Sequence, residues 1–493
     1  MSNLAVLPVV IPFLAGILAT FFHKRITIVR VFSQIATIIS LGVSLWITYY
    51  VSQYGTVVLE MGAWQAPYGI VFVADMLAIS LVVAINVVAT ACVFYAPVSL
   101  TEEKERFFFY TFYFLLLTGV AGAFLTGDLF NLFVFFEVLL IASYGLIVLG
   151  NERVQLRESL KYVLLNLFSS MLFVTAIAFI YSVVGTVNMA QIAERVQVVE
   201  QHGILTTIAV LLFFVFATKA AIFPLYYWLP KSYAVPNPVV SALFGALLTK
   251  VGIYSILRAF TLIFVHDPEI THQLFLWLAA LTMLLGAIGA LSTHNVKLIV
   301  TYNIIPAVGF MLLGIGLLSE TGVAGSVYYL IHDIIIKAAL FLIIGAIVAL
   351  MGTSNLKQMG GFIHHYPFLG WSFFIATLVL AGIPPFSGFI GKLLLIQGGV
   401  EQGEFALVII ALFSSLLILL SLMRIFIRGI WGEKDEEMAV NKPLARKFAT
   451  PVAFLLIFSI LLGIGAEWFY PHVELIANEL LDPNVYINSI LKE

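Results

Sequence analysis

Five charged side chains stand deep inside long apolar runs. Glu137 lies in FVFFEVLLI, Lys219 in FVFATKAAIFP and Lys250 in FGALLTKVGIY, while Lys337 and Lys392 lie in HDIIIKAALF and PPFSGFIGKLLL. A charge at the centre of a membrane helix costs about 2.5–3.5 kcal/mol on insertion scales, so such residues normally face a protein interior or water. Their position therefore marks them as candidate functional residues.

The chemistry of this set is that of proton transfer. Burial favours the neutral form of a lysine, whereas a nearby carboxylate favours the protonated form, so changing the distance between them moves a proton. The set lacks the oxygen ligands of a dedicated sodium site. Histidine ordinarily titrates near neutral pH, which makes His332 a further candidate. The alternative is a group of structural ion pairs. We expect a proton relay formed by Glu137, Lys219, Lys250, His332, Asp333, Lys337 and Lys392.

Composition limits where such residues can work. The chain has 493 residues, of which 62% are hydrophobic and only 10% charged. Average soluble domains carry about 25% charged residues, so a soluble enzyme is excluded and a lipid bilayer is the expected environment. A net charge of −2 gives no basic face for nucleic acid. Cys92 is the single cysteine, which excludes disulfides within the chain, and we expect no cofactor and no metal.

Apolar runs of about 20 residues predict membrane-spanning helices. The fold predicted is an all-α polytopic membrane protein with about 14 spans. They lie near residues 4–22, 28–50, 70–96, 107–125, 129–149, 162–185, 204–229, 239–263, 273–293, 298–318, 323–350, 370–399, 405–428 and 450–470.

The basic residues predict the orientation, because cytoplasmic loops hold an excess of Lys and Arg. Of the 24 Lys and Arg residues, 17 lie in or beside the loops after odd-numbered spans, and four lie inside spans. The three in the remaining loops and the C-terminal tail are Arg195, Arg258 and Lys492. This asymmetry predicts that both termini lie outside.

Two spans contain residues that interrupt helices. Span 7 contains Pro224, and span 12 contains Pro384 and Pro385. Proline removes a backbone hydrogen bond, and interrupted helices at matching places of two halves indicate an ion-binding region. Spans 4–8 and 9–13 form two five-helix sets, with spans 7 and 12 each fourth. Because five is odd, the second set is inverted.

This pattern predicts four regions along the chain. They are an N-terminal three-helix region (1–100), a first five-helix repeat (101–263), an inverted second repeat (264–430), and a last helix with a tail (431–493). Each repeat would form one half-channel. The tail after residue 470 mixes polar and apolar residues, and it predicts a segment on the membrane surface, a segment on a partner, or a frayed end.

Four stretches resemble the antiporter-like subunits shared by respiratory complex I, membrane-bound hydrogenases and Mrp-type cation/proton antiporters. They are FPLYYWLPKSYAVPNPVVSALFGALLTKVGIY (223–254), HNVKLIVTYNIIPAVGFMLLGIG (294–316), HDIIIKAALFLIIGAI (332–347) and AGIPPFSGFIGKLLL (381–395). Residues 127–148 are most similar to the D subunits of Mrp-type sodium/proton antiporters. The resemblance implies 14 helices with two inverted repeats.

The resemblance also implies roles for single residues. Glu137 would pair with Lys219, Lys250 would be the connecting lysine of span 8, and Lys392 the terminal proton site of the second half. His332 and Lys337 would link the halves. Asp333 departs from relatives that have histidine one turn before the span-11 lysine.

The resemblance implies a setting as well. It points to a proton-translocating subunit of a sodium/proton antiporter rather than an enzyme, in the bacterial cell membrane. Its partners would be A-, B-, C-, E-, F- and G-type membrane subunits, protons and monovalent cations. Two alternatives stay open, which are a proton-pumping subunit of a complex I-like oxidoreductase or membrane hydrogenase, and a scaffold that carries no ions.

Overall fold

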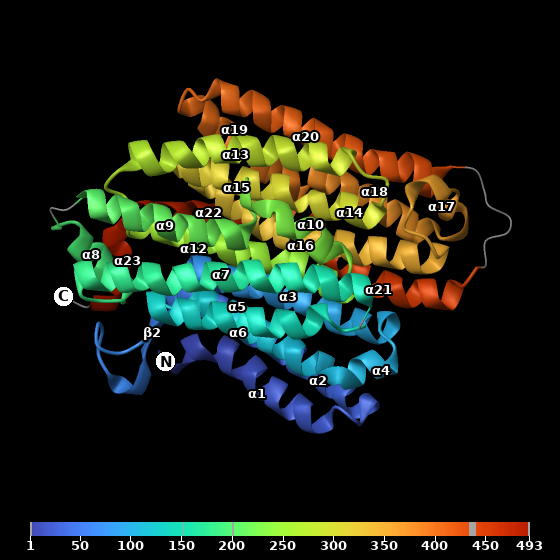
Figure 1. Ribbon diagram of the computed structural model, residues 1–493, viewed down its shortest axis with the longest axis horizontal. Helices are drawn as coiled ribbons and strands as arrows, with labels where there is room; N and C mark the ends of the chain where they lie inside the picture. Colours follow the sequence, from blue (N-terminus) through green and yellow to red (C-terminus); the bar gives the residue numbers. More distant parts are fainter. Residues whose placement is uncertain (1, 151, 200–201, 433–439, 492–493) are drawn as a thin grey trace.

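Long helices that run back and forth form almost the whole molecule (Figure 1). The computed structural model describes residues 2–150, 152–199, 202–432 and 440–491. Within these ranges, 13 helices are long and apolar enough to cross a membrane. The prediction of an all-α polytopic membrane protein is confirmed. Lys434 and Lys492, which entered the charge count, lie outside the described residues.

The elements follow one another in four groups. The first comprises η1 (Ser2–Val6), α1 (Leu7–Phe22), α2 (Ile26–Tyr54), β1 (Val57–Glu60), η2 (Met61–Ala63), β2 (Val71–Ala74) and α3 (Met76–Ser99). The second comprises α4 (Glu102–Lys104), η3 (Glu105–Phe109), α5 (Tyr110–Leu125), α6 (Leu129–Ile147), α7 (Arg153–Val184), α8 (Met189–Val196), α9 (His202–Ala220), η4 (Leu225–Trp228), α10 (Leu229–Ala234), α11 (Pro238–Leu243), η5 (Phe244–Leu248) and α12 (Thr249–Leu262).

The third group carries the second interrupted span. It comprises α13 (Pro268–Leu291), α14 (Val296–Tyr302), α15 (Ile304–Leu317), α16 (Glu320–Met351), η6 (Leu356–Gln358), α17 (Phe362–His365), α18 (Pro367–Ala381), α19 (Ser387–Glu401), α20 (Phe405–Ile425) and η7 (Phe426–Trp431). The last group comprises α21 (Lys442–Ile464), α22 (Ala466–Leu481) and α23 (Pro483–Leu491).

Both expected helix interruptions are present. α9 ends at Ala220, and Pro224 lies in the gap before η4. α18 ends at Ala381 and α19 begins at Ser387, with Pro384 and Pro385 between them. The span expected as one helix over 370–399 is therefore two helices of 15 residues each. Each is shorter than the roughly 20 residues that cross a bilayer.

Further irregularities were not predicted, and two of them lie beside the buried lysines. The span expected over 298–318 is divided at Asn303, between α14 and α15. The span expected over 239–263 contains a π-helical turn, η5, just before Lys250. Such turns are rare inside helices and are frequent at functional sites.

Polar caps fix several helix starts. Asp75 Oδ1 accepts a hydrogen bond from Ala78 N at the start of α3, at 2.8 Å. Asp128 Oδ1 does the same for Asn131 N at the start of α6, at 2.7 Å. A cap of this kind satisfies backbone N–H groups that the first helical turn leaves free.

The N-terminal loop region contains a short ribbon that the sequence did not reveal. β1 pairs antiparallel with β2, from Val57 opposite Ala74 to Glu60 opposite Val71. The residues of β2 are all buried. The ribbon lies at the same end of the bundle as α8 and α23 (Figure 1).

The C-terminal tail is helical and packed. α22 contacts α16 and α12, and α23 contacts α8 and α12. Val473, Ile476 and Tyr486 are among its buried residues. The alternative of a frayed end is therefore wrong.

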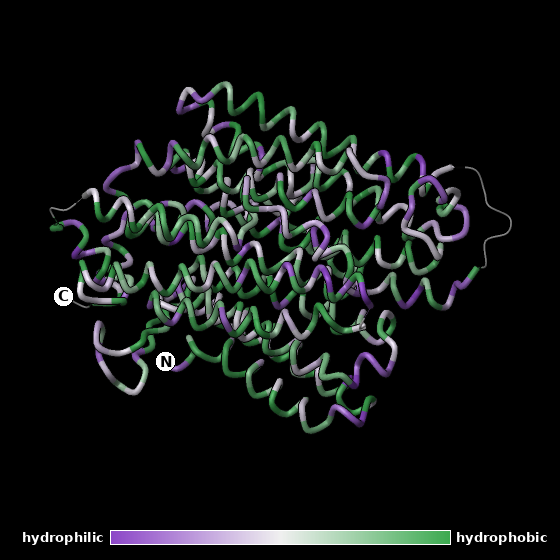
Figure 2. The backbone as a smooth tube through the Cα atoms, viewed as in Figure 1, coloured by the Kyte–Doolittle hydropathy of each residue, from purple (hydrophilic) through white to green (hydrophobic). Residues whose placement is uncertain are grey.

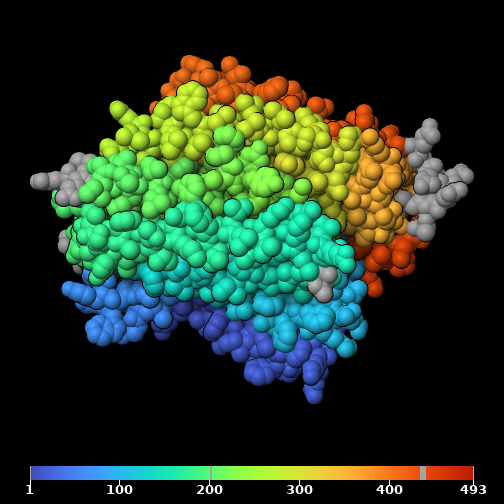
Figure 3. All heavy atoms as spheres, viewed as in Figure 1, coloured from blue at the N-terminus to red at the C-terminus, as the bar shows by residue number. Residues whose placement is uncertain are grey.

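Both chain ends lie at one end of the bundle, whereas α4 and α17 lie at the other (Figure 1). Most residues along the helices are hydrophobic, and hydrophilic residues gather toward the two ends of the bundle (Figure 2). The viewed face follows the sequence from the N-terminal helices at one edge to α20 at the other (Figure 3). α12 is covered on all sides, because its whole apolar stretch is buried.

Candidate functional site

One carboxylate lies between two lysines at the centre of the bundle. Asp333 Oδ2 is 2.7 Å from Lys250 Nζ, and Asp333 Oδ1 is 3.6 Å from Lys337 Nζ. All three side chains are completely buried, Lys250 on α12 and the others on α16. Charges this deep are tolerated when they are paired and hydrogen-bonded. The structure therefore joins three of the predicted residues in one cluster, which we call the central cluster.

Irregular backbone surrounds the central cluster. Lys250 Nζ donates to the carbonyl oxygen of Gly245 in the π-helical turn, at 2.7 Å. Lys337 Nζ donates to the carbonyl oxygen of Asn303, which lies between α14 and α15, also at 2.7 Å. Irregular backbone survives at membrane depth only where protein or water covers it. These two irregularities supply polar partners for the two lysines.

Lys392 lies at the interruption between α18 and α19. Its Nζ donates to the carbonyl oxygens of Leu380 and Ala381, at 3.0 and 2.9 Å. These carbonyls end α18, and the C-terminus of a helix carries partial negative charge. The ring of Phe310 is 4.9 Å from the same nitrogen. The interruption therefore places partially negative carbonyl oxygens next to the lysine nitrogen.

His332 connects α16 to the same break. Its Nδ1 is 2.8 Å from Ser387 Oγ, at the start of α19. Ser387 Oγ is in turn 3.3 Å from Ser459 Oγ on α21. His332 directly precedes Asp333 in the chain and contacts the start of α19, which carries Lys392. It therefore links the central cluster to the helix of Lys392.

Lys219 occupies the last turn of α9, before the first interruption. Its Nζ donates to Asn166 O at 3.2 Å and to Ser170 Oγ at 3.1 Å, both on α7. The expected ion pair with Glu137 is not formed in this structure, since the lysine amine is held by α7. Glu137 is half-buried on α6, and its Oε1 is buried without a hydrogen-bond partner.

Sequence reasoning missed the groups that hold the lysines. Gly245, Asn303 and Leu380 act through backbone carbonyls, which every residue possesses, so residue type carries no signal for them. Ser387 is different, because it directly follows the Pro384-Pro385-Phe386 stretch that was recognised as a break.

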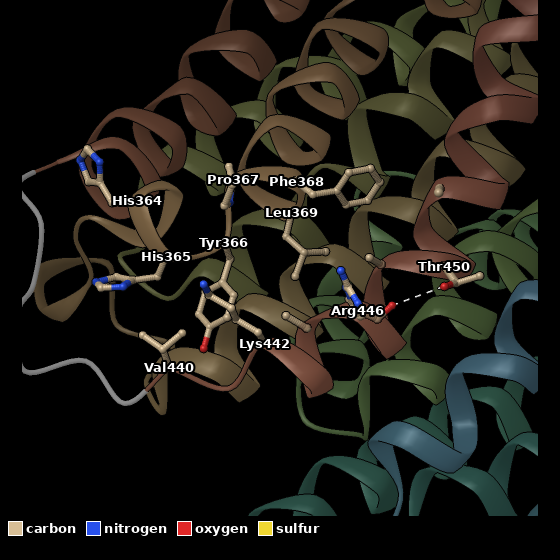
Figure 4. A pocket seen from close by; sticks show the side chains of 13 residues that line it. His364, His365, Tyr366, Pro367, Phe368, Leu369, Val440, Lys442, Arg446 and Thr450 are labelled. Carbon is tan, nitrogen blue, oxygen red and sulfur yellow. Dashed lines mark hydrogen bonds between the residues drawn. The ribbon is translucent and has the colours of Figure 1, made fainter.

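A separate cavity of about 1070 Å³ opens among α17, α18 and the start of α21 (Figure 4). Its basic side chains are His364, His365, Lys442 and Arg446, and Tyr366 lines it as well. Among the described residues, none of the predicted relay residues lines it. The cavity is therefore distinct from the buried charges.

The geometry defines a class of protein, a polytopic membrane protein with a charged interior. Residues 126–418 match the family described as NADH:quinone oxidoreductase/Mrp antiporter, TM. The chain is 50% identical to the D subunit of the Na(+)/H(+) antiporter of Bacillus subtilis (strain 168), over 100% of both chains.

Solved structures agree with this match. A chain of the Mrp complex from Dietzia sp. DQ12-45-1b is 30% identical, with a TM-score of 0.91 and full coverage of both chains. A chain of respiratory complex I from Thermus thermophilus, 22% identical with a TM-score of 0.82, covers 96% of this chain and 100% of that one, and it shows the same fold. The protein belongs to the NADH:quinone oxidoreductase/Mrp antiporter family, among the D subunits of Na(+)/H(+) antiporters. It is accordingly a transporter component rather than an enzyme.

Proposed function

We propose that this chain is the proton-translocating subunit of a sodium/proton antiporter complex, in which the buried lysines and carboxylates pass protons. The central cluster is the observation that carries the proposal. Three charges with no exposure to solvent are costly to keep in a membrane protein, and such residues mark ion routes and proton relays. The name of the Bacillus subtilis relative supports the sodium/proton assignment.

The two interrupted spans fit the ends of such a route. Lys219 lies before the first interruption and Lys392 follows the second, with the central cluster between them in chain order. Lys250 and Lys337 share Asp333, so a proton leaving one lysine changes the charge that the other meets. Glu137 acts electrostatically on Lys219 without forming an ion pair in this structure, and it completes the proposed relay when the two side chains pair.

The setting proposed is the bacterial cell membrane. The chain would assemble with the A-, B-, C-, E-, F- and G-type membrane subunits, and the inverted repeats would form one half-channel each. Sodium would cross with the help of these partners, because the lysine-rich interior offers no shell of oxygen ligands for it.

The test replaces single relay residues in the assembled complex. Lys219→Ala, Lys250→Ala and Glu137→Gln are each expected to lower sodium-dependent proton movement in everted vesicles about 100-fold, the usual scale for a lost proton-transfer group. Lys357→Ala, an exposed lysine in η6, is the control.

The amount of complex in the membrane separates the outcomes. Normal assembly with lost transport supports the relay, whereas failed assembly of every variant supports a scaffold with structural ion pairs. Near-normal transport by the three relay variants would refute the proposal.

A further inference from the structure

A second buried ion pair lies on the same helix as Lys250. Lys250, Tyr254 and Arg258 follow at four-residue spacing on α12, which places their side chains on one face of the helix. All three are buried. Tyr254 Oη donates to the carbonyl oxygen of Phe124 at 2.6 Å. The row leads from the central cluster toward α23, because Arg258 contacts Tyr486 on that helix. α23 lies at the end of the bundle where both chain termini lie (Figure 1).

Arg258 ends this row. Its Nη2 donates to Asp75 Oδ2, the other oxygen of the carboxylate that caps α3. The guanidinium carbon is 5.6 Å from the ring of Tyr254 and 4.9 Å from the ring of Tyr486 on α23. Its Nε is buried without a hydrogen-bond partner. Most buried polar groups are hydrogen-bonded, so this donor marks a place for a further polar partner.

A small cavity connects this pair to the C-terminal helices. It measures about 20 Å³, which is enough for one water molecule. Asp75, Arg258, Glu479 and Tyr486 line it, together with Thr56, Leu77, Ile476, Leu480, Val485 and Ser489. A water there has polar partners in the lining, because Asp75, Arg258 and Glu479 all border the cavity.

Glu479 on α22 is the most exposed charged residue of the cavity lining. It is half-buried, whereas Asp75 and Arg258 are buried. Burial and the charge of Asp75 raise the pKa of Glu479, and Arg258 opposes this effect. Arg258 itself stays protonated at all working pH values. The charged and titratable groups around the cavity are therefore Asp75, Arg258, Glu479, Tyr486 and, beneath the guanidinium, Tyr254.

We propose that Asp75, Arg258 and Glu479 form the outer mouth of the proton route, covered by α22 and α23. A proton on the Glu479 carboxyl passes through a water to the Asp75 carboxylate, or moves in reverse. Between Arg258 and Lys250 on the α12 face, the carrier is the Tyr254 hydroxyl, which releases one proton as it accepts another. Each transfer leaves one carboxylate and one protonated group, so charge balances. Arg258 takes no proton, and it holds the two carboxylates and the water in position. This inference rests on the proposed relay.

The experiment replaces Glu479 in the assembled complex. Glu479→Gln keeps the size of the side chain but cannot carry a proton, and it is expected to lower sodium-dependent proton movement about tenfold or more. Glu479→Asp should retain most of the transport and shift the pH of half-maximal activity. Glu474→Gln, on another face of the same helix, is the matched control.

The outcomes are distinct. Wild-type transport with a wild-type pH profile in Glu479→Gln would overturn the proposed mouth. Equal losses of transport in all three variants, with less assembled complex, would also overturn it. A side chain that only holds helices together does not change the pH of half-maximal activity when Asp replaces Gln. If Lys250→Ala transports normally, the relay itself fails. If Lys250→Ala is inactive while Glu479→Gln is normal, only the mouth fails.

Discussion

Each lysine buried in the membrane region donates to a backbone carbonyl of a neighbouring segment. The acceptors are Asn166 for Lys219, Gly245 for Lys250, Asn303 for Lys337, and Leu380 with Ala381 for Lys392. A carbonyl accepts from a neutral amine as well as from an ammonium group, so it keeps the side chain in place through a change of charge. The fixed position suits a group that exchanges a proton without moving far.

Asp333 is the residue on which the central cluster depends. Asp333→Asn removes the counter-ion of two buried lysines, and breaking a buried pair in this way costs about 3–5 kcal/mol. We expect a lower melting temperature of the purified complex together with loss of transport. Glu320→Gln, at the exposed start of α16, is the control and should keep both. Unchanged stability in Asp333→Asn would show that the cluster is not charged as described.

The residue scale also shows the limit of sequence reasoning. Apolar surroundings identify the buried lysines, but the pairing of Lys250 with Asp333 depends on how α12 and α16 pack. Arg258 and Asp75, which are 183 positions apart, give no local signal for their contact. From the sequence alone, Arg258 is a basic residue near a helix end and nothing more.

At the scale of elements, the interruptions were predictable and their surroundings were not. Clustered proline and glycine in an apolar run predict a break, as around Pro384 and Pro385. A single proline does not, since Pro97 and Pro451 lie inside continuous helices. The division at Asn303 and the π-helical turn before Lys250 each have only one such residue beside them, Pro306 and Gly245, and one residue does not predict a break. Tertiary packing selects these irregularities and the ribbon of β1 and β2 over the ordinary helical pattern.

The second interruption depends on a close approach at Gly388. A Cβ atom there would lie 2.0 Å from the carbonyl oxygen of Val379 and 3.1 Å from the ring of His332. Gly388→Ala is therefore expected to destabilise the protein by about 1–3 kcal/mol, as overpacking does. Transport should fall as well, because the shift displaces α18 and the carbonyls that hold Lys392.

The control for this change is Gly42→Ala. No atom lies within 4 Å of a Cβ built at Gly42 in α2, so stability should stay the same or rise slightly. Thermal unfolding of the purified complex measures both variants. Equal stability of the two variants would show that Gly388 and Val379 can move apart at the interruption without cost.

The cap of α6 predicts a dependence on pH. Burial raises the pKa of Asp128 from 3.8 to about 6, against the hydrogen bonds from Asn131 and Phe130 that lower it. The folded protein therefore keeps this proton where the unfolded chain loses it, and folding becomes less favourable as pH rises from about 4 to about 6. Above that window the cost is about 3 kcal/mol and constant.

Asp128→Asn retains an oxygen for the cap without the charge. We expect it to flatten the decrease of melting temperature between about pH 4 and about pH 6 and to raise stability at pH 8. Asp482→Asn, an exposed site between α22 and α23, serves as the control. A pH profile identical to wild type would show that Asp128 is charged throughout this range.

At the scale of the whole molecule, the charge asymmetry predicts which end faces the cytoplasm. Loops rich in Lys and Arg belong to the end with α4 and α17, and both termini lie at the other (Figure 1). Alkaline phosphatase fused to the C-terminus should therefore be active, and a fluorescent protein there should be dark. Fusions after Lys357 should give the opposite pattern, and the same result at both sites would contradict the orientation.

The single carboxylate of the central cluster has a consequence for how many protons the molecule holds at once. Asp333 neutralises one positive charge, so two protonated lysines leave one charge uncompensated in a region shielded from water. Proton binding at Lys250 therefore disfavours proton binding at Lys337, which is negative cooperativity between two coupled sites. The two halves of the chain would then load their protons in turn, out of phase with each other.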